Sequence, residues 1–124
     1  MNKRILILGD LLAIALVTFI GFATHGEAGL SFLPRMAAAF FPLVIAWFLL
    51  APWFGLFHDN IVHNARQLWR PVLTALFAAP LASVVRGLIL NAPIIPVFAV
   101  VLGVTTGLGM AIWRGLYFRF NRLL

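Results

Sequence analysis

A single acidic residue, Asp10, lies inside an apolar run that extends from about residue 5 to 23. A carboxylate within a membrane span is costly and normally faces a bundle interior, where a cation balances it. Arg114 is the predicted partner, because it lies at a similar depth in another apolar run, and Arg70 competes for that role. Two interpretations stand: a structural ion pair that fixes helix rotation, and a site that takes up a proton or cation during transport.

Two arginines, Arg35 and Arg86, lie near the ends of apolar runs on the opposite side, where Glu27 is the only acidic residue. Two guanidinium groups can bind an anionic head group or a carboxylate substrate bidentately. They can equally extend to the membrane interface or pair with Glu27. The three residues form a candidate anion or lipid site, with interfacial extension as the simpler interpretation.

The histidines give little support for a metal site. Asp59 and His63 would share one helix face at i,i+4, with His58 off that face. In a zinc motif of the H-E-x-x-H kind the second histidine follows the first by four residues, but Val62 occupies that place after His58. The chain has no cysteine, no serine-nucleophile motif and no glycine-rich phosphate loop. We therefore expect no metal and no cofactor, and enzymatic activity is disfavoured, with an enzyme acting on a lipid as the remaining alternative.

The composition places these residues in a membrane. Of the 124 residues, 64% are hydrophobic and only 10% are charged, whereas about a quarter are charged in a soluble domain. Four apolar stretches approach the ~20 residues that a helix needs to cross a bilayer, and they run from about 5–23, 35–54, 68–90 and 93–117. The sequence predicts an all-α integral membrane bundle of four antiparallel helices, in a single domain that covers residues 1–124.

The basic residues predict the orientation of the bundle. Those at the N-terminus, in the second connection or at the C-terminus are Lys3, Arg4, Arg66, Arg70, Arg114, Arg119 and Arg122. Only Arg35 and Arg86 lie on the other side. Because cytoplasmic segments carry the excess of Lys and Arg, we expect both termini in the cytoplasm and the chain in the cell membrane. The net charge of +6 therefore reflects topology, and we expect no nucleic-acid partner.

Aromatic residues and prolines add further expectations. Trp69, Trp113 and Tyr117 fall at the cytoplasmic ends of their spans and are predicted to anchor at the interface. Pro42 and Pro80 lie inside the second and third spans and are predicted to kink them. Static bends are the simpler interpretation of the kinks, and a hinge is the alternative.

Two glycines in the fourth span, Gly103 and Gly107, form a G-x-x-x-G pattern. This spacing favours close contact between helices, because neither residue has a side chain that keeps a neighbouring backbone away. The contact is expected either inside the bundle or with a second copy of the chain.

A set of short motifs occurs in a characteristic order. They are Gly9-Asp10, Leu33-Pro34-Arg35, Trp69-Arg70, Ala78-Ala79-Pro80-Leu81-Ala82, Arg86, Pro96, Phe98-Ala99-Val100 and Trp113-Arg114. In this order they resemble DUF3054, a family of small prokaryotic membrane proteins of unknown function. The resemblance covers nearly the whole chain and implies a four-span fold with no established activity. The loop 55–67, which holds the histidines, is not part of the pattern.

The sequence supports two functional hypotheses. The first is a small structural or accessory membrane protein that packs against itself or against a larger membrane complex. The alternative is a small oligomeric transporter or channel for protons or small anions, which uses Asp10 and the arginines Arg35 and Arg86 along its path. In both, the lipid bilayer surrounds the protein, and a homo-oligomer or larger complex is the expected assembly.

Overall fold

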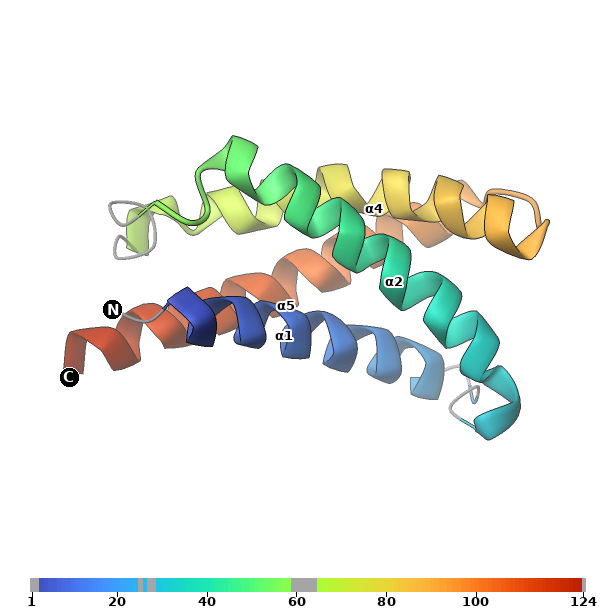
Figure 1. Ribbon diagram of the computed structural model, residues 1–124, viewed down its shortest axis with the longest axis horizontal. Helices are drawn as coiled ribbons and strands as arrows, with labels where there is room; N and C mark the ends of the chain where they lie inside the picture. Colours follow the sequence, from blue (N-terminus) through green and yellow to red (C-terminus); the bar gives the residue numbers. More distant parts are fainter. Residues whose placement is uncertain (1–2, 25, 27–28, 59–64, 124) are drawn as a thin grey trace.

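A computed structural model shows an all-α protein built from four long helices (Figure 1). It describes residues 3–24, 26, 29–58 and 65–123. The four helices are α1 (Lys3–Thr24), α2 (Leu33–Leu50), α4 (Trp69–Leu90) and α5 (Pro96–Leu123). Each is long and apolar enough to cross a membrane. The prediction of four apolar spanning helices is therefore confirmed, and no strand occurs in the ranges given above.

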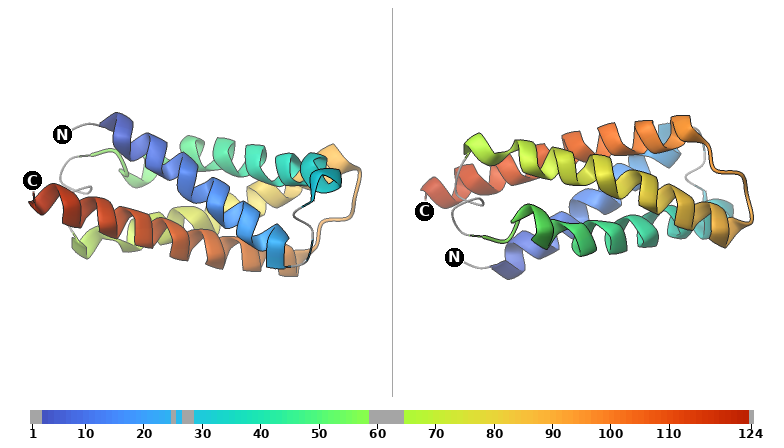
Figure 2. Two further views of the ribbon diagram at one scale, coloured as in Figure 1. Left: turned by 90° about the horizontal axis from the view of Figure 1, so that it is seen from below. Right: turned by 90° about the horizontal axis from the view of Figure 1, so that it is seen from above.

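The helices form an antiparallel bundle in which each packs against two neighbours (Figures 1 and 2). Helix α1 contacts α2 and α5, and α4 contacts the same two helices on the other side of the bundle. The chain starts and ends at one end of the bundle, called here the terminus end. The connections from α1 to α2 and from α4 to α5 lie at the opposite end (Figure 2).

The second predicted span ends in a tighter helix. Helix α2 ends at Leu50, and the chain continues as a short 3₁₀ helix, η2 (Ala51–Phe54), which contains Pro52. Gly55 then adopts the left-handed conformation with φ 69°, where a residue without Cβ is favoured. The chain turns there, and the Leu56 amide donates to the carbonyl of Ala51. The turn brings Leu56 back into the core, where its side chain is fully buried.

The fourth helix begins and ends later than the predicted run from 93 to 117. Asn91 closes α4 in the left-handed conformation, with φ 50°. Pro93 and Pro96 follow, and the residue before a proline prefers an extended backbone, so α5 begins only at Pro96. It continues to Leu123, because residues 118–123 contain no glycine or proline that would end the helix.

Small residues mediate the closest helix contacts. Gly103 and Gly107 of α5 face α4, where Leu76 and Ala79 approach the first glycine and Val72 approaches the second. Buried alanines of α2 and α4 make a similar surface, comprising Ala38, Ala39, Ala46, Ala75, Ala78, Ala79 and Ala82. Of the two places expected for the G-x-x-x-G contact, the structure shows the one inside the bundle. This close approach stabilises membrane helices, which gain little from hydrophobic burial against one another.

Both helices that contain an internal proline continue through it. Pro42 is buried within α2, whereas Pro80 is exposed on α4. Each removes one backbone donor from its helix. The prediction that they kink α2 and α4 stays a prediction.

A leucine at Gly103 should destabilise the bundle, whereas the same change at Gly21 should not. A Cβ on Gly103 would already lie 3.3 Å from both the Ala79 Cβ and the Leu76 Cδ2 atoms, while a Cβ on Gly21 meets nothing within 4 Å. We expect Gly103→Leu to cost about 1–3 kcal/mol of unfolding free energy through overpacking. Thermal unfolding in one detergent measures both variants. Equal melting temperatures for Gly103→Leu and Gly21→Leu would contradict this packing.

Candidate functional site

The centre of the candidate site is an ion pair between Asp10 of α1 and Arg114 of α5. Arg114 Nη2 lies 2.7 Å from Asp10 Oδ2, and Arg114 Nε lies 3.0 Å from Asp10 Oδ1. Two parallel hydrogen bonds of this kind match the planar fork of a guanidinium to the two oxygens of a carboxylate. The Asp10 side chain is 0% exposed and that of Arg114 is 4% exposed. The charges are therefore removed from solvent and from lipid alike.

Two tryptophans complete the coordination of the Asp10 carboxylate. The indole Nε1 of Trp113 donates to Oδ1 at 2.9 Å, and that of Trp47 on α2 donates to Oδ2 at 3.3 Å. Each carboxylate oxygen thus accepts one bond from Arg114 and one from a tryptophan. An ionised carboxylate has about four acceptor positions, and all four are occupied. The arrangement holds a charge in a fixed place and leaves no acceptor for a water molecule or a cation.

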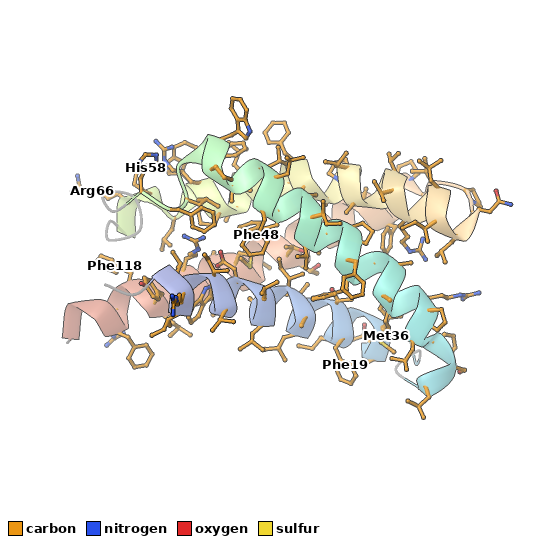
Figure 3. The ribbon with its side chains drawn as sticks, in the orientation of Figure 1. Phe19, Met36, Phe48, His58, Arg66 and Phe118 are labelled. Atoms are coloured by element: carbon orange, nitrogen blue, oxygen red, sulfur yellow. The ribbon has the colours of Figure 1, made fainter. Side chains whose placement is uncertain are left out.

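Arg114 also reaches the turn that follows α2. Its Nη1 donates to the carbonyl oxygen of Leu56 at 2.6 Å, and its Cζ lies 5.6 Å from the centre of the Phe57 ring. Phe57 stacks on Phe48, whose side chain Figure 3 shows on the side of α2 that faces α1 and α5. Through Arg114 the site therefore joins α1, α5 and the turn after α2.

Gly9 explains how Trp113 can reach Asp10. A Cβ atom at position 9 would overlap the indole ring of Trp113, so the ring occupies the space beside the α1 backbone that a side chain would otherwise fill. The dipeptides Gly9-Asp10 and Trp113-Arg114 consequently pack as a unit: the glycine accepts the ring while the aspartate accepts the guanidinium. Because α1 and α5 are antiparallel neighbours, the Gly9–Trp113 and Asp10–Arg114 contacts lie at one level of the bundle.

Arg70, the competing partner for Asp10, has a different role. Its Nη1 donates to the carbonyl of Phe54 at 2.9 Å, its Nε donates to Gln67 at 2.7 Å, and its guanidinium covers the ring of Trp69. Arg70 of α4 and Arg114 of α5 thus each donate to a backbone carbonyl of the same turn. The side chains of this turn are apolar and cannot donate hydrogen bonds. Its backbone carbonyls therefore need donors from elsewhere in the bundle, and the two arginines supply them.

The structure does not bring together Arg35 and Arg86, the two arginines of the candidate anion or lipid site. Arg35 is exposed in the first turn of α2, and within the described ranges it has no hydrogen bond or ion pair. Arg86 lies on α4 with its Cζ atom 4.6 Å from the centre of the Phe98 ring. The start of α2 and the end of α4 diverge at the opposite end of the bundle (Figure 1). Glu27 lies outside the described residues.

The candidate metal residues are only partly described. His58 is exposed at the terminus end, beside the turn after α2 (Figure 3). Asp59 and His63 lie outside the described residues. In the part of the chain that the structure describes, His58 belongs to no group of three or more His, Cys, Asp or Glu side chains that could hold a metal.

The two tryptophan donors to Asp10 were not predicted from the sequence. Trp113 and Tyr117 were expected at the interface, but Trp113 is half-buried and bonded to Asp10, and Tyr117 is buried. The expectation is wrong for this pair because α5 turns both rings toward α1. For Trp69, which is exposed, it stays a prediction. A usable signal was the spacing: Trp113 is adjacent to Arg114, as Gly9 is adjacent to Asp10.

Four apolar helices around one buried ion pair define a multi-pass helical membrane protein. Residues 7–117 match the family described as "Protein of unknown function (DUF3054)", and the chain belongs to this family, as its motifs indicated. The matched range includes Asp10, Arg114 and both tryptophans. Comparisons with curated proteins and with solved structures gave no match.

Replacing Asp10 by Asn should destabilise the protein strongly. The amide keeps the shape but leaves the buried Arg114 without its counter-charge, and breaking a buried pair in this way costs about 3–5 kcal/mol. Thermal unfolding in detergent measures the loss, with Arg35→Gln as the control, because Arg35 is exposed and unpaired among the described residues. A melting temperature for Asp10→Asn equal to that of the control would contradict a structural role for the pair.

A methyl group at Gly9 should disturb the same site without changing its charge. Gly9→Ala forces the Trp113 ring away from α1 and removes one donor from Asp10. We expect a red shift of the tryptophan emission and a loss of about 1–3 kcal/mol, the cost of an unsatisfied buried acceptor. Gly21→Ala is the matched control, since the space beside Gly21 is open. An unchanged emission spectrum in Gly9→Ala would refute the contact.

Proposed function

We propose that this protein is a small structural or accessory membrane subunit whose Asp10–Arg114 site locks the bundle. The observation that carries the proposal is the full coordination of Asp10: Arg114 supplies two donors, and Trp47 and Trp113 supply one each. A carboxylate that relays protons or binds cations needs an acceptor position that opens to water. Here the four donors, the full burial and the bidentate geometry favour a fixed charge pair.

The groove between α1 and α2 agrees with a structural role. It lies toward the opposite end of the bundle, where Phe19 and Met36 are side by side in Figure 3. Its lining is apolar apart from the hydroxyl of Thr18, and it includes no charged residue. A path for protons or small anions would need polar groups along such a surface, so the groove does not extend the Asp10 site toward the far side.

The orientation of the subunit forms part of the proposal. Both termini lie at the same end of the bundle (Figure 1), and that end carries Arg4, Arg66 and Arg119. On the positive-inside rule, the proposal is that the terminus end faces the cytoplasm and that the protein belongs to the cell membrane. The G-x-x-x-G face is already used between α4 and α5. A partner complex, or a second copy, would therefore pack on the large apolar side chains of the outer faces.

Reconstitution in liposomes separates the structural role from transport. We expect vesicles with the wild-type protein to conduct protons and chloride no faster than protein-free vesicles. Asp10→Asn should lower the yield of folded protein and leave the conductance at that background level. Dye-reported pH and chloride changes measure the conductance, and Arg35→Gln serves as the matched charge control. If the wild type conducts and a folded Asp10→Asn variant selectively loses conductance, the transporter alternative replaces this proposal.

A further inference from the structure

Arg86 is a cation near the opposite end of the bundle for which the described structure supplies no anion. It lies four residues before the end of α4 at Leu90, or about 6 Å inside the end of the helix. Its Nε atom is buried and has no hydrogen-bond partner. No described residue forms an ion pair with it. A guanidinium charge inside a membrane bundle is costly without a counter-charge, so this position calls for an anion.

The guanidinium of Arg86 does not extend away from the bundle. Its Cζ atom lies 4.6 Å from the centre of the Phe98 ring, and Phe98 is half-buried in the first turn of α5. An arginine that only reaches for the interface directs its head group away from the core along an apolar stem. Here stacking on an aromatic face holds the guanidinium between the end of α4 and the start of α5.

The start of α5 adds positive potential at the same place. Helix α5 begins at Pro96 and is 28 residues long, and the first-turn amides of a long helix carry partial positive charge. The guanidinium and these amides attract the same kind of ligand, an anion. Asp10 cannot serve, because it is bound to Arg114 toward the terminus end.

We propose that Arg86 and the start of α5 bind the phosphate group of a membrane phospholipid. A phosphate presents several oxygens to the guanidinium and can accept from its two Nη groups. The ligand also needs an apolar part, because the end of α4 and the start of α5 expose the apolar side chains of Leu88, Ile89 and Val97. A phospholipid combines the two, with its phosphate near the end of α4 and its chains along these residues.

Binding of three probes to the full chain in detergent tests the proposal. Phosphatidylglycerol carries phosphate and acyl chains, diacylglycerol with the same chains lacks the phosphate, and inorganic phosphate lacks the chains. Native mass spectrometry measures the affinity of each. We expect phosphatidylglycerol to bind about tenfold or more tightly than diacylglycerol, as one charge-assisted hydrogen-bond pair would give. Inorganic phosphate should not displace the lipid.

Three variants assign this preference to the site. Arg86→Gln should abolish the tenfold preference, and Phe98→Leu should reduce it while the charge stays. Arg35→Gln should keep it, since Arg35 is exposed on α2 at the same end of the bundle. If Arg86→Gln does not fold, the reduced lipid preference of Phe98→Leu tests the proposal in its place.

Several results would overturn the proposal. They are an unchanged preference in Arg86→Gln, an equal loss in Arg35→Gln, and displacement of the lipid by inorganic phosphate. A preference that emerges only in Glu27→Gln would also overturn it, because Glu27 would then be the internal anion of Arg86.

Discussion

The bidentate contact between Asp10 and Arg114 is the interaction on which the rest of the structure depends. A charge inside an apolar bundle is tolerated only when a partner neutralises it and donors satisfy it. Meeting that requirement fixes the rotation of α1 and α5 about their axes, because both side chains must point into one interface. It also fixes α2, since the Trp47 indole on that helix must reach the same carboxylate.

The polarity of the site extends to the backbone of one turn. After Gly55 the chain folds back into the bundle, and its carbonyl groups need donors that lipid does not provide. Arg114 binds the Leu56 carbonyl and Arg70 binds that of Phe54. Arg114 and Arg70, which the sequence presents as alternative partners of Asp10, therefore have different roles. One neutralises Asp10 and supports the turn, and the other supports the turn from α4.

Hydropathy and helical depth predict part of this arrangement, and the remainder depends on rotation and backbone conformation. The four helices follow from apolar length, and the pairing of Asp10 with Arg114 follows from their similar depth. The direction of the Trp113 ring does not follow from hydropathy or depth, because it depends on the space that Gly9 leaves beside α1. Nor does hydropathy show that Gly55 would turn left-handed and bring Leu56 inside. Arg35 and Arg86 look equivalent in the sequence, yet only Arg86 stacks against a neighbouring helix.

The central claim is that Asp10 and Arg114 stabilise the bundle together, as one unit. A double-mutant cycle tests it most directly, through the unfolding free energies of the wild type, Asp10→Asn, Arg114→Gln and the double variant. Residues in direct contact give coupling energies of about 0.5–3 kcal/mol, and for a bidentate pair we predict the upper half of that range, with the double variant no less stable than the weaker single variant. Additivity of the two single losses within about 0.5 kcal/mol would contradict the account.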